Sequence, residues 1–240
     1  MLTTGRIDSH SHILPGIDDG CPDLDASLAC VRQFMAAGYV GTICTPHVIP
    51  KMYPGNTPRT IQTRVTELQA EITRQGLDYQ VWPGGEFLLA QDNWEWFERD
   101  GVPTLGSSRA VLMDWWETSW PDFADATIDR LFAEGYQPIL AHPERMKLPQ
   151  GELLELVDAL SARGVWLQGN LNSLSGGEGT QSQALCRTWL QSGRYELLAS
   201  DAHHPDRLAG RFEGLQVAID LVGLDQVKEL VERRIRALVE

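Results

Sequence analysis

The sequence has no pair of cysteines at the spacing of a redox motif or of a cysteine zinc site. Its four cysteines are far apart among 240 residues, and no C-x-x-C occurs. We expect free, buried thiols in a reducing compartment. Cys44 falls within an apolar, strand-like segment rather than an anion-binding loop, so catalysis by a nucleophilic thiol is not expected.

Long apolar runs are also absent. No segment approaches the ~20 apolar residues that cross a bilayer, and residues 1–6 lack the charged-then-apolar pattern of a secretory signal sequence. These absences predict a cytoplasmic protein without membrane insertion. There is no internal repeat, linker or low-complexity segment, and the length suits one domain spanning 1–240.

Positive charge is scarce as well. The chain has 20 Lys and Arg against 33 Asp and Glu, a net charge of -13. This balance disfavours a nucleic-acid-binding protein, which normally presents a basic face. An anionic substrate remains compatible, because bound divalent ions reverse the charge locally.

Short apolar segments alternate with amphipathic ones along the whole chain. This alternation predicts parallel βαβ units, and seven of them indicate a barrel, with a doubly wound sheet as the alternative. The expected strands are 5–12, 40–45, 80–86, 110–115, 137–141, 165–170 and 197–200. The expected helices are 24–37, 57–75, 122–134, 152–163, 181–192 and 211–240, the second with Thr57 as N-cap and Pro58 in its first turn.

All six histidines lie in four short clusters that follow the apolar segments. The clusters are D-S-H-S-H, T-P-H, A-H-P-E-R and S-D-A-H-H. Function in βα barrels is found at the carboxyl ends of the strands, and residues i and i+2 of a strand point to the same side. His10 and His12 can therefore bind one ion, as can Asp201 and His203. The pattern predicts a metal site on the rim of a barrel.

The motifs I-D-S-H-S-H-I-L-P-G-I-D-D-G, C-T-P-H, G-G-E-F, I-L-A-H-P-E-R, Q-G-N-L-N-S-L-S-G and A-S-D-A-H occur in this order. Together they resemble the PHP (polymerase and histidinol phosphatase) superfamily, and within it the bacterial tyrosine-protein phosphatases of capsular and exopolysaccharide operons. The resemblance runs from about Ile7 to His203. It implies an α/β fold, a distorted seven-stranded (βα)7 TIM-like barrel that holds three divalent ions, expected to be Mn, with Fe, Zn or Co as alternatives.

The resemblance also implies a role for each matching residue. His10, His12, Glu86 and Asp201 would hold the first ion, Glu86, Asp114 and His142 the second, and Asp19, His47 and His203 the third. Arg145 would bind phosphate, and the further arginine of the family would be Arg207, with Arg211 as the next candidate. Asp114 stands where the capsular phosphatases carry Glu, and Val48-Ile49-Pro50-Lys51 replaces the basic continuation after T-P-H.

Several residues near these motifs have a less specific expectation. Asp18 is expected in a turn or cap, Glu144 as an exposed loop carboxylate or else a partner of a ligand histidine, and His204 as pointing away from the site. Asn170 and Asn172 could support the ligands or only form turns. Most tryptophans are expected in the core, but Trp115, Trp116 and Trp120 follow the fourth strand and could stack on a tyrosyl ring.

We therefore expect a metal-dependent protein tyrosine phosphatase that acts on a phosphotyrosine-containing protein, a membrane-associated kinase of polysaccharide export. The alternatives are a small-molecule phosphatase such as histidinol phosphatase, a phosphodiesterase, and a metal-stabilised binding partner of the kinase with little turnover. The general acid and the oligomeric state stay open.

Overall fold

The structure, a computed structural model, describes residues 5–240. Residues 1–4 lie outside this range. They belong to segment 1–6, in which the sequence shows no signal-sequence pattern. Every expected strand is present, and two of them are broken into shorter pieces. The strands are β1 (Arg6–Ser11), β2 (Tyr39–Cys44), β3 (His47–Val48), β4 (Gln80–Pro83), β5 (Glu86–Leu88), β6 (Ala110–Asp114), β7 (Gln137–Ala141), β8 (Trp166–Asn170) and β9 (Leu197–Ala199).

The two broken strands lie side by side, and both breaks have a local cause. Pro46 separates β2 from β3, because proline has no N–H to continue the ladder. Gly84 and Gly85 separate β4 from β5, and a Cβ on Gly84 would lie 2.8 Å from a methyl carbon of Ile43. Pairing resumes after the breaks, where β3 and β5 run in parallel and place His47 opposite Glu86.

The strands form one distorted parallel barrel. The sheet orders are β1-β2-β4 and β3-β5-β6-β7-β8-β9, and the broken strands connect the two sheets. The barrel closes where β1 meets the segment after β9. His12 N donates to Ala202 O (2.7 Å), and Asp201 N donates to His10 O (2.9 Å). The structure confirms the expected (βα)7-type barrel.

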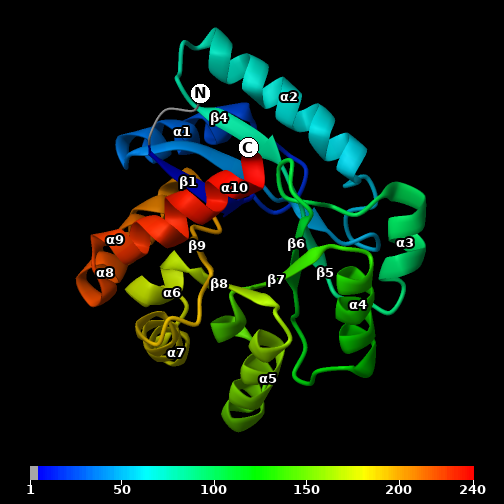
Figure 1. The fold of residues 1–240 in the computed structure, drawn as a ribbon. Helices are drawn as coiled ribbons and strands as arrows, with labels where there is room; N and C mark the ends of the chain where they lie inside the picture. The colour runs from blue at the N-terminus through cyan, green and yellow to red at the C-terminus, as the bar shows by residue number, and fades with distance from the viewer. Residues whose placement is uncertain (1–4) are drawn as a thin grey trace.

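Helices surround the ring of strands (Figure 1). They are α1 (Leu24–Ala36), α2 (Pro58–Arg74), α3 (Asn93–Asp100), α4 (Asp122–Ala133), α5 (Gln150–Ala162), α6 (Leu171–Ser175), α7 (Thr180–Gln191), α8 (Leu208–Val222), α9 (Leu224–Lys228) and α10 (Arg234–Val239), with short 3₁₀ turns η1 (Pro143–Arg145) and η2 (Pro205–Arg207) and a π-helical turn η3 (Glu229–Arg233). The expected cap of α2 is confirmed, since Thr57 Oγ1 accepts from Thr60 N and Pro58 opens the helix.

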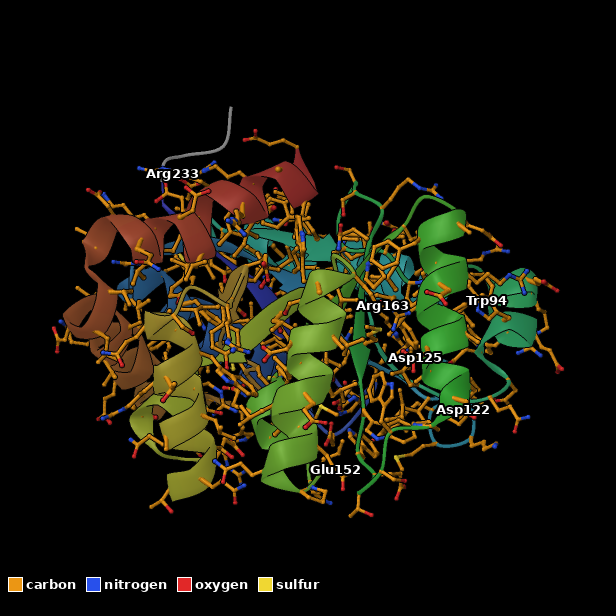
Figure 2. The ribbon with its side chains drawn as sticks, turned by 60° about the horizontal axis from the view of Figure 1, so that its bottom comes forward. Trp94, Asp122, Asp125, Glu152, Arg163 and Arg233 are labelled. Carbon is orange, nitrogen blue, oxygen red and sulfur yellow. The ribbon has the colours of Figure 1, made fainter. Side chains whose placement is uncertain are left out.

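Ion pairs connect neighbouring helices of the outer layer. Arg163, which follows α5, pairs with Asp125 and Asp129 of α4, and Figure 2 shows Arg163 beside Asp125 between these two helices. Among residues 5–240, no helix combines the length and apolar character needed to cross a membrane.

The C-terminal helix α10 closes the barrel at the amino ends of the strands. Its Ile235, Leu238 and Val239 are buried with the residues that fill the barrel, such as Ile7 and Leu112. Burial of each large side chain contributes about 1.5–3 kcal/mol. With this end covered, the opposite rim, at the carboxyl ends of the strands, is left open for a functional site.

Candidate metal centre

The nine side chains expected as ligands gather at the rim. They come from the end of β1, from the loop after it and from the ends or starts of other strands. Eight of the nine residues are at most half exposed, and Asp19 is the exception. The set is His10, His12, Asp19, His47, Glu86, Asp114, His142, Asp201 and His203. Three groups of potential ligand atoms lie close together within it: His10 with His12 and Asp201; His10 with Glu86 and His142; and His12 with Asp19, His47 and His203.

The first group lies at the bottom of the site and is fully buried. His10 Nε2 and His12 Nε2 are 3.1 Å apart. Asp201 Oδ1 lies 3.4 Å from the first and 3.5 Å from the second. Glu86 lies 3.4 Å from both imidazoles, through different oxygens. Glu86 therefore faces the same space as the two histidines and Asp201.

The second group shares His10 with the first and adds Glu86 and His142, on the side of β6 and β7. His142 Nε2 lies 3.0 Å from Glu86 Oε1. Asp114 is less closely placed, with its Oδ1 3.7 Å from His142 Nδ1. Its oxygens instead accept hydrogen bonds from Trp115 N and from the indole of Trp116. The structure thus brings His142 to Glu86 but holds Asp114 partly away from them.

The third group lies nearer the surface. Asp19 Oδ1 is 3.4 Å from His47 Nε2 and 3.6 Å from His203 Nε2. The rings of His12 and His203 stack with centroids 4.0 Å apart. The loop that carries Asp19 can approach β1 because residue 20 is glycine, since a Cβ there would lie 1.9 Å from His12 O.

These spacings fit divalent cations. Ligand atoms about 2.1 Å from one ion lie roughly 3–3.5 Å from each other, which matches the 3.1–3.5 Å separations among His10, His12 and Asp201. The Nε2 atoms of His10 and His12 face each other. Without a shared cation, neither nitrogen is a good partner for the other. Imidazole and carboxylate together suit Mn, Fe, Co or Zn.

Electrostatics of the cluster favour positive charge. Burial opposes ionisation of Glu86, but the His10 imidazole and hydrogen bonds from the neighbouring histidines lower its pKa well below the usual range. Burial also opposes protonation of His10, but the charges of Glu86 and Asp201 raise its pKa to about 10. Burial raises the pKa of Asp114. The buried carboxylates thus stabilise protons on the histidines, in the place that bound cations would take.

A second layer of side chains orients the candidate ligands. Asp18 Oδ2 accepts from His12 Nδ1 at 2.7 Å, and Gln168 Oε1 accepts from His10 Nδ1 at 2.7 Å. Such contacts select the tautomer that points Nε2 at a metal. The expectation that Asp18 lies in a turn is confirmed, since its Oδ1 accepts from Gly20 N, and the contact with His12 is a further role that was not expected. Gln168 was not recognised, and its signal is a polar residue inside an apolar strand.

Arg145 lies above the cluster on η1. Its Nη1 donates to Asp201 Oδ2 (2.6 Å), and its Nε lies 3.4 Å from Glu178, a loop residue that the sequence did not indicate. Asn170 Nδ2 donates to the same Asp201 oxygen (2.9 Å), so it supports a ligand residue. Asn172, the other uncertain residue, donates to Glu178.

Glu144 differs from both expectations. It is 2% exposed, and its carboxylate accepts from Asn170 N and Tyr195 Oη rather than from a ligand histidine. An exposed loop carboxylate was therefore the wrong prediction. The burial of Glu144 could not be predicted from the sequence, because it arises where the short turn after β7 folds back against β8.

The two arginines after the last motif occupy different environments. Arg211 is 6% exposed and donates to Ser200 O and Asp201 O (2.6 and 2.7 Å), so it supports the backbone at Asp201. That backbone is left-handed, with φ 52° at Asp201, a conformation unusual outside glycine. Arg207 is exposed and lines a cavity of about 650 Å³ that also includes Arg145, Asp19 and His203. His204 lies on the wall of this cavity and pairs with Asp206 instead of the ligands.

A smaller cavity of about 160 Å³ lies beside the cluster. Trp115, Trp116, His142, Arg145 and Lys147 line it, together with Asp114 and Met146. Trp116 is 36% exposed and meets the His47 ring edge-on, whereas Trp115 packs against Trp120 and Phe123. The cavity brings an aromatic wall and the Arg145 guanidinium to the same place.

Several known proteins resemble this chain along most of its length. A putative tyrosine-protein phosphatase CapC of Staphylococcus aureus is 28% identical over 199 residues, which cover 82% of this chain and 76% of that protein. The tyrosine-protein phosphatase YwqE of Bacillus subtilis is 28% identical over 82% of this chain and 77% of its own. The tyrosine-protein phosphatase CpsB of Streptococcus pneumoniae is 26% identical over 93% and 94%.

Solved structures agree with these matches. One from a study of YwqE from Bacillus subtilis and CpsB from Streptococcus pneumoniae, described as unique metal-dependent tyrosine phosphatases, superposes with a TM-score of 0.85 at 27% identity, covering 97% of this chain and 94% of that one. A histidinol phosphate phosphatase from Lactococcus lactis shares the fold, with a TM-score of 0.55 at 15% identity over 91% and 94%. The family described as "Capsular polysaccharide synthesis, CpsB/CapC" matches residues 6–235, and the chain belongs to this family.

Proposed function

We propose that this chain is a metal-dependent tyrosine-protein phosphatase that removes phosphate from a phosphotyrosine segment of a membrane-associated kinase in polysaccharide export. The observation that carries the proposal is the position of Arg145, which lines both rim cavities directly above the ligand cluster. Membership of the CpsB/CapC family and the tyrosine phosphatase relatives support the choice of substrate.

Three divalent ions, with manganese as the expected metal, fit the three groups of ligand atoms. Asp19, His47 and His203 would hold the outermost ion, and Glu86 would contribute to the inner two. When bound, such ions lower the pKa of a coordinated water and neutralise the charge on phosphate oxygens.

The side chains around the cluster would position the substrate. Arg145 presents a planar guanidinium suited to two phosphate oxygens. The small cavity of about 160 Å³ is close to the roughly 150 Å³ that accommodates a benzene ring. Trp116 forms part of its wall, so a tyrosyl ring could stack there while its phosphate meets Arg145. Arg207 would attract the negative charge of the substrate from the larger cavity.

The test is hydrolysis of a phosphotyrosyl peptide and of histidinol phosphate by the manganese-loaded protein. We expect the peptide to be the better substrate and elemental analysis to find two or three metal ions per chain. Arg145→Ala should lower kcat/KM by about 30- to 1,000-fold, the equivalent of roughly 2–4 kcal/mol, with metal content unchanged. Arg163→Ala, on the outer helices, should leave catalysis unchanged.

The alternatives give different results in the same experiment. Preference for histidinol phosphate would assign the protein to small-molecule phosphatases. Stoichiometric binding of the peptide without turnover would indicate a binding partner. A metal content below one ion per chain after reconstitution would refute the metal centre itself.

A further inference from the structure

Glu144 is a buried carboxylate that neither the ligand cluster nor the proposed chemistry uses. It sits on η1 directly before Arg145, and the two side chains make separate connections. Glu144 Oε1 accepts from Asn170 N (2.9 Å) and Oε2 accepts from Tyr195 Oη (2.9 Å). Arg145 instead reaches Asp201. One short turn is thereby attached to β8, to the segment before β9, and to the ligand residue after β9.

Asn170 joins these connections into a closed ring. Its backbone N–H binds Glu144, and its side-chain amide donates to Asp201 Oδ2 at 2.9 Å. The same oxygen accepts from Arg145 Nη1 at 2.6 Å. The ring therefore runs from Glu144 through the chain to Arg145, then to Asp201, to Asn170 and back to Glu144. Apart from Arg145, its side chains are at most 5% exposed.

The turn needs such support. His142, which begins it, has φ 33°, in the left-handed region where a non-glycine residue is strained. Arg145 itself has a side chain that is 34% exposed and many rotamers. Without a fixed backbone, its guanidinium would have to be ordered each time phosphate binds, and that ordering would weaken binding.

We propose that Glu144 is a positioning residue, which holds η1 against β8 so that Arg145 is already oriented for phosphate before substrate arrives. This inference rests on the proposed function only in that Arg145 binds phosphate. Because both carboxylate oxygens accept from neutral donors, the role depends on shape rather than on charge. Glutamine can fill it, accepting from Asn170 N and donating to Tyr195 Oη, whereas aspartate is one methylene too short.

The experiment measures the dissociation constant for inorganic phosphate by calorimetry on the manganese-loaded full chain, with metal content and thermal unfolding beside it. Glu144→Ala and Glu144→Asp should weaken phosphate binding on the order of tenfold, the loss of one well-placed charged hydrogen bond. Glu144→Gln should stay within about twofold of the unmodified protein. Metal content should be the same in all three.

Two controls separate positioning from a general structural role. Glu196→Gln changes another glutamate that accepts a backbone N–H of β8, from Leu167 at 2.8 Å, but has no connection to Arg145, and it should leave phosphate binding unchanged. In an Arg145→Ala background, Glu144→Ala should cause no further loss, because Glu144 acts through Arg145.

The outcomes are decisive in both directions. Phosphate binding unchanged in Glu144→Ala, loss of metal together with phosphate, an equal effect of Glu144→Gln, or additive losses in the double variant would each overturn the inference. If Glu144→Ala does not fold, Glu144→Asp and Glu144→Gln still decide it. Arg145-dependent phosphate binding without hydrolysis of any phosphotyrosyl peptide would refute the proposed function alone. A protein that does not bind phosphate through Arg145 would overturn both.

Discussion

Replacement of Asp18 by asparagine should weaken manganese binding without changing any residue expected to touch the metal. The Asp18 carboxylate accepts from His12 Nδ1 (2.7 Å), His47 N (3.0 Å) and Gly20 N (3.0 Å), and its side chain is 1% exposed. Burial opposes its ionisation, but the charge of His12 and these hydrogen bonds lower its pKa. The Asp18 carboxylate therefore binds both the imidazole of His12 and the backbone N–H of His47.

The expected loss of manganese affinity follows from the hydrogen bonds and the charge that asparagine cannot supply. Asparagine has one acceptor oxygen where aspartate has two, so an amide N–H must face one of the three donors. The negative charge that favours the Nδ1–H tautomer of His12 is also lost. Outer partners of ligand histidines are typically worth 10- to 100-fold in metal affinity, which corresponds to roughly 1.4–2.8 kcal/mol.

The assay is competition for manganese between the protein and a chromophoric chelator at fixed pH. Asp23→Asn is the matched control, since Asp23 lies in the same loop but caps α1 through Ala26 N at 2.9 Å, a role in which asparagine is as good. We expect a higher dissociation constant for Asp18→Asn alone. Equal manganese affinity in Asp18→Asn and the unmodified protein would refute the idea that this contact orients His12.

Three further predictions concern the same rim. Asp114→Glu should retain or raise metal occupancy and activity, since a longer side chain can close the 3.7 Å gap to His142, and a folded variant that loses both would contradict this. Trp116→Ala should raise KM for a phosphotyrosyl peptide several-fold, which corresponds to roughly 1 kcal/mol for one ring contact. Trp120→Ala, the control, should lower the melting temperature and leave KM unchanged. An unchanged KM in both variants would count against ring stacking in the small cavity. In the metal-free protein, neighbouring carboxylates outweigh burial and raise the pKa of His10 to about 10, so the stability that its proton contributes is complete below about pH 6.5 and is lost as pH rises toward 10. Manganese affinity should rise over the same window. Thermal unfolding with and without manganese checks this, and a melting temperature of the chelated protein that does not change with pH would contradict it.

Much of the site could be predicted because strand ends are marked locally. His10 and His12 are two residues apart on one strand, and the alternation of strand side chains directs both to the same side. The carboxyl ends of parallel strands meet at one rim, so Glu86 and His142 could be expected together although 56 residues separate them. The family resemblance added Asp19, whose loop has no regular periodicity.

Other residues could not be assigned from the sequence, because their roles depend on contacts across the barrel. Glu144 looks like any polar residue of a short turn, and its burial follows from how η1 packs on β8 and Tyr195. Trp115 and Trp116 are adjacent and both line the small cavity, yet Trp115 is buried against Trp120 and Phe123 whereas Trp116 is more exposed and contacts His47. Arg211, not Arg207, supports the backbone at Asp201, which no spacing indicated.

The sequence by itself therefore determined the alternation of the main strands and helices, although not the short helices α3 and α6, together with the kind of fold and the chemical nature of the site, since each depends on periodicity and on motifs within a few residues. The tertiary structure alone decided which polar groups are buried together: Asp18 with His12, Gln168 with His10, and Glu144 with Asn170. The physical reason is that a buried polar group must find a partner wherever the packed barrel places one, and in this chain the partner can be 158 residues away.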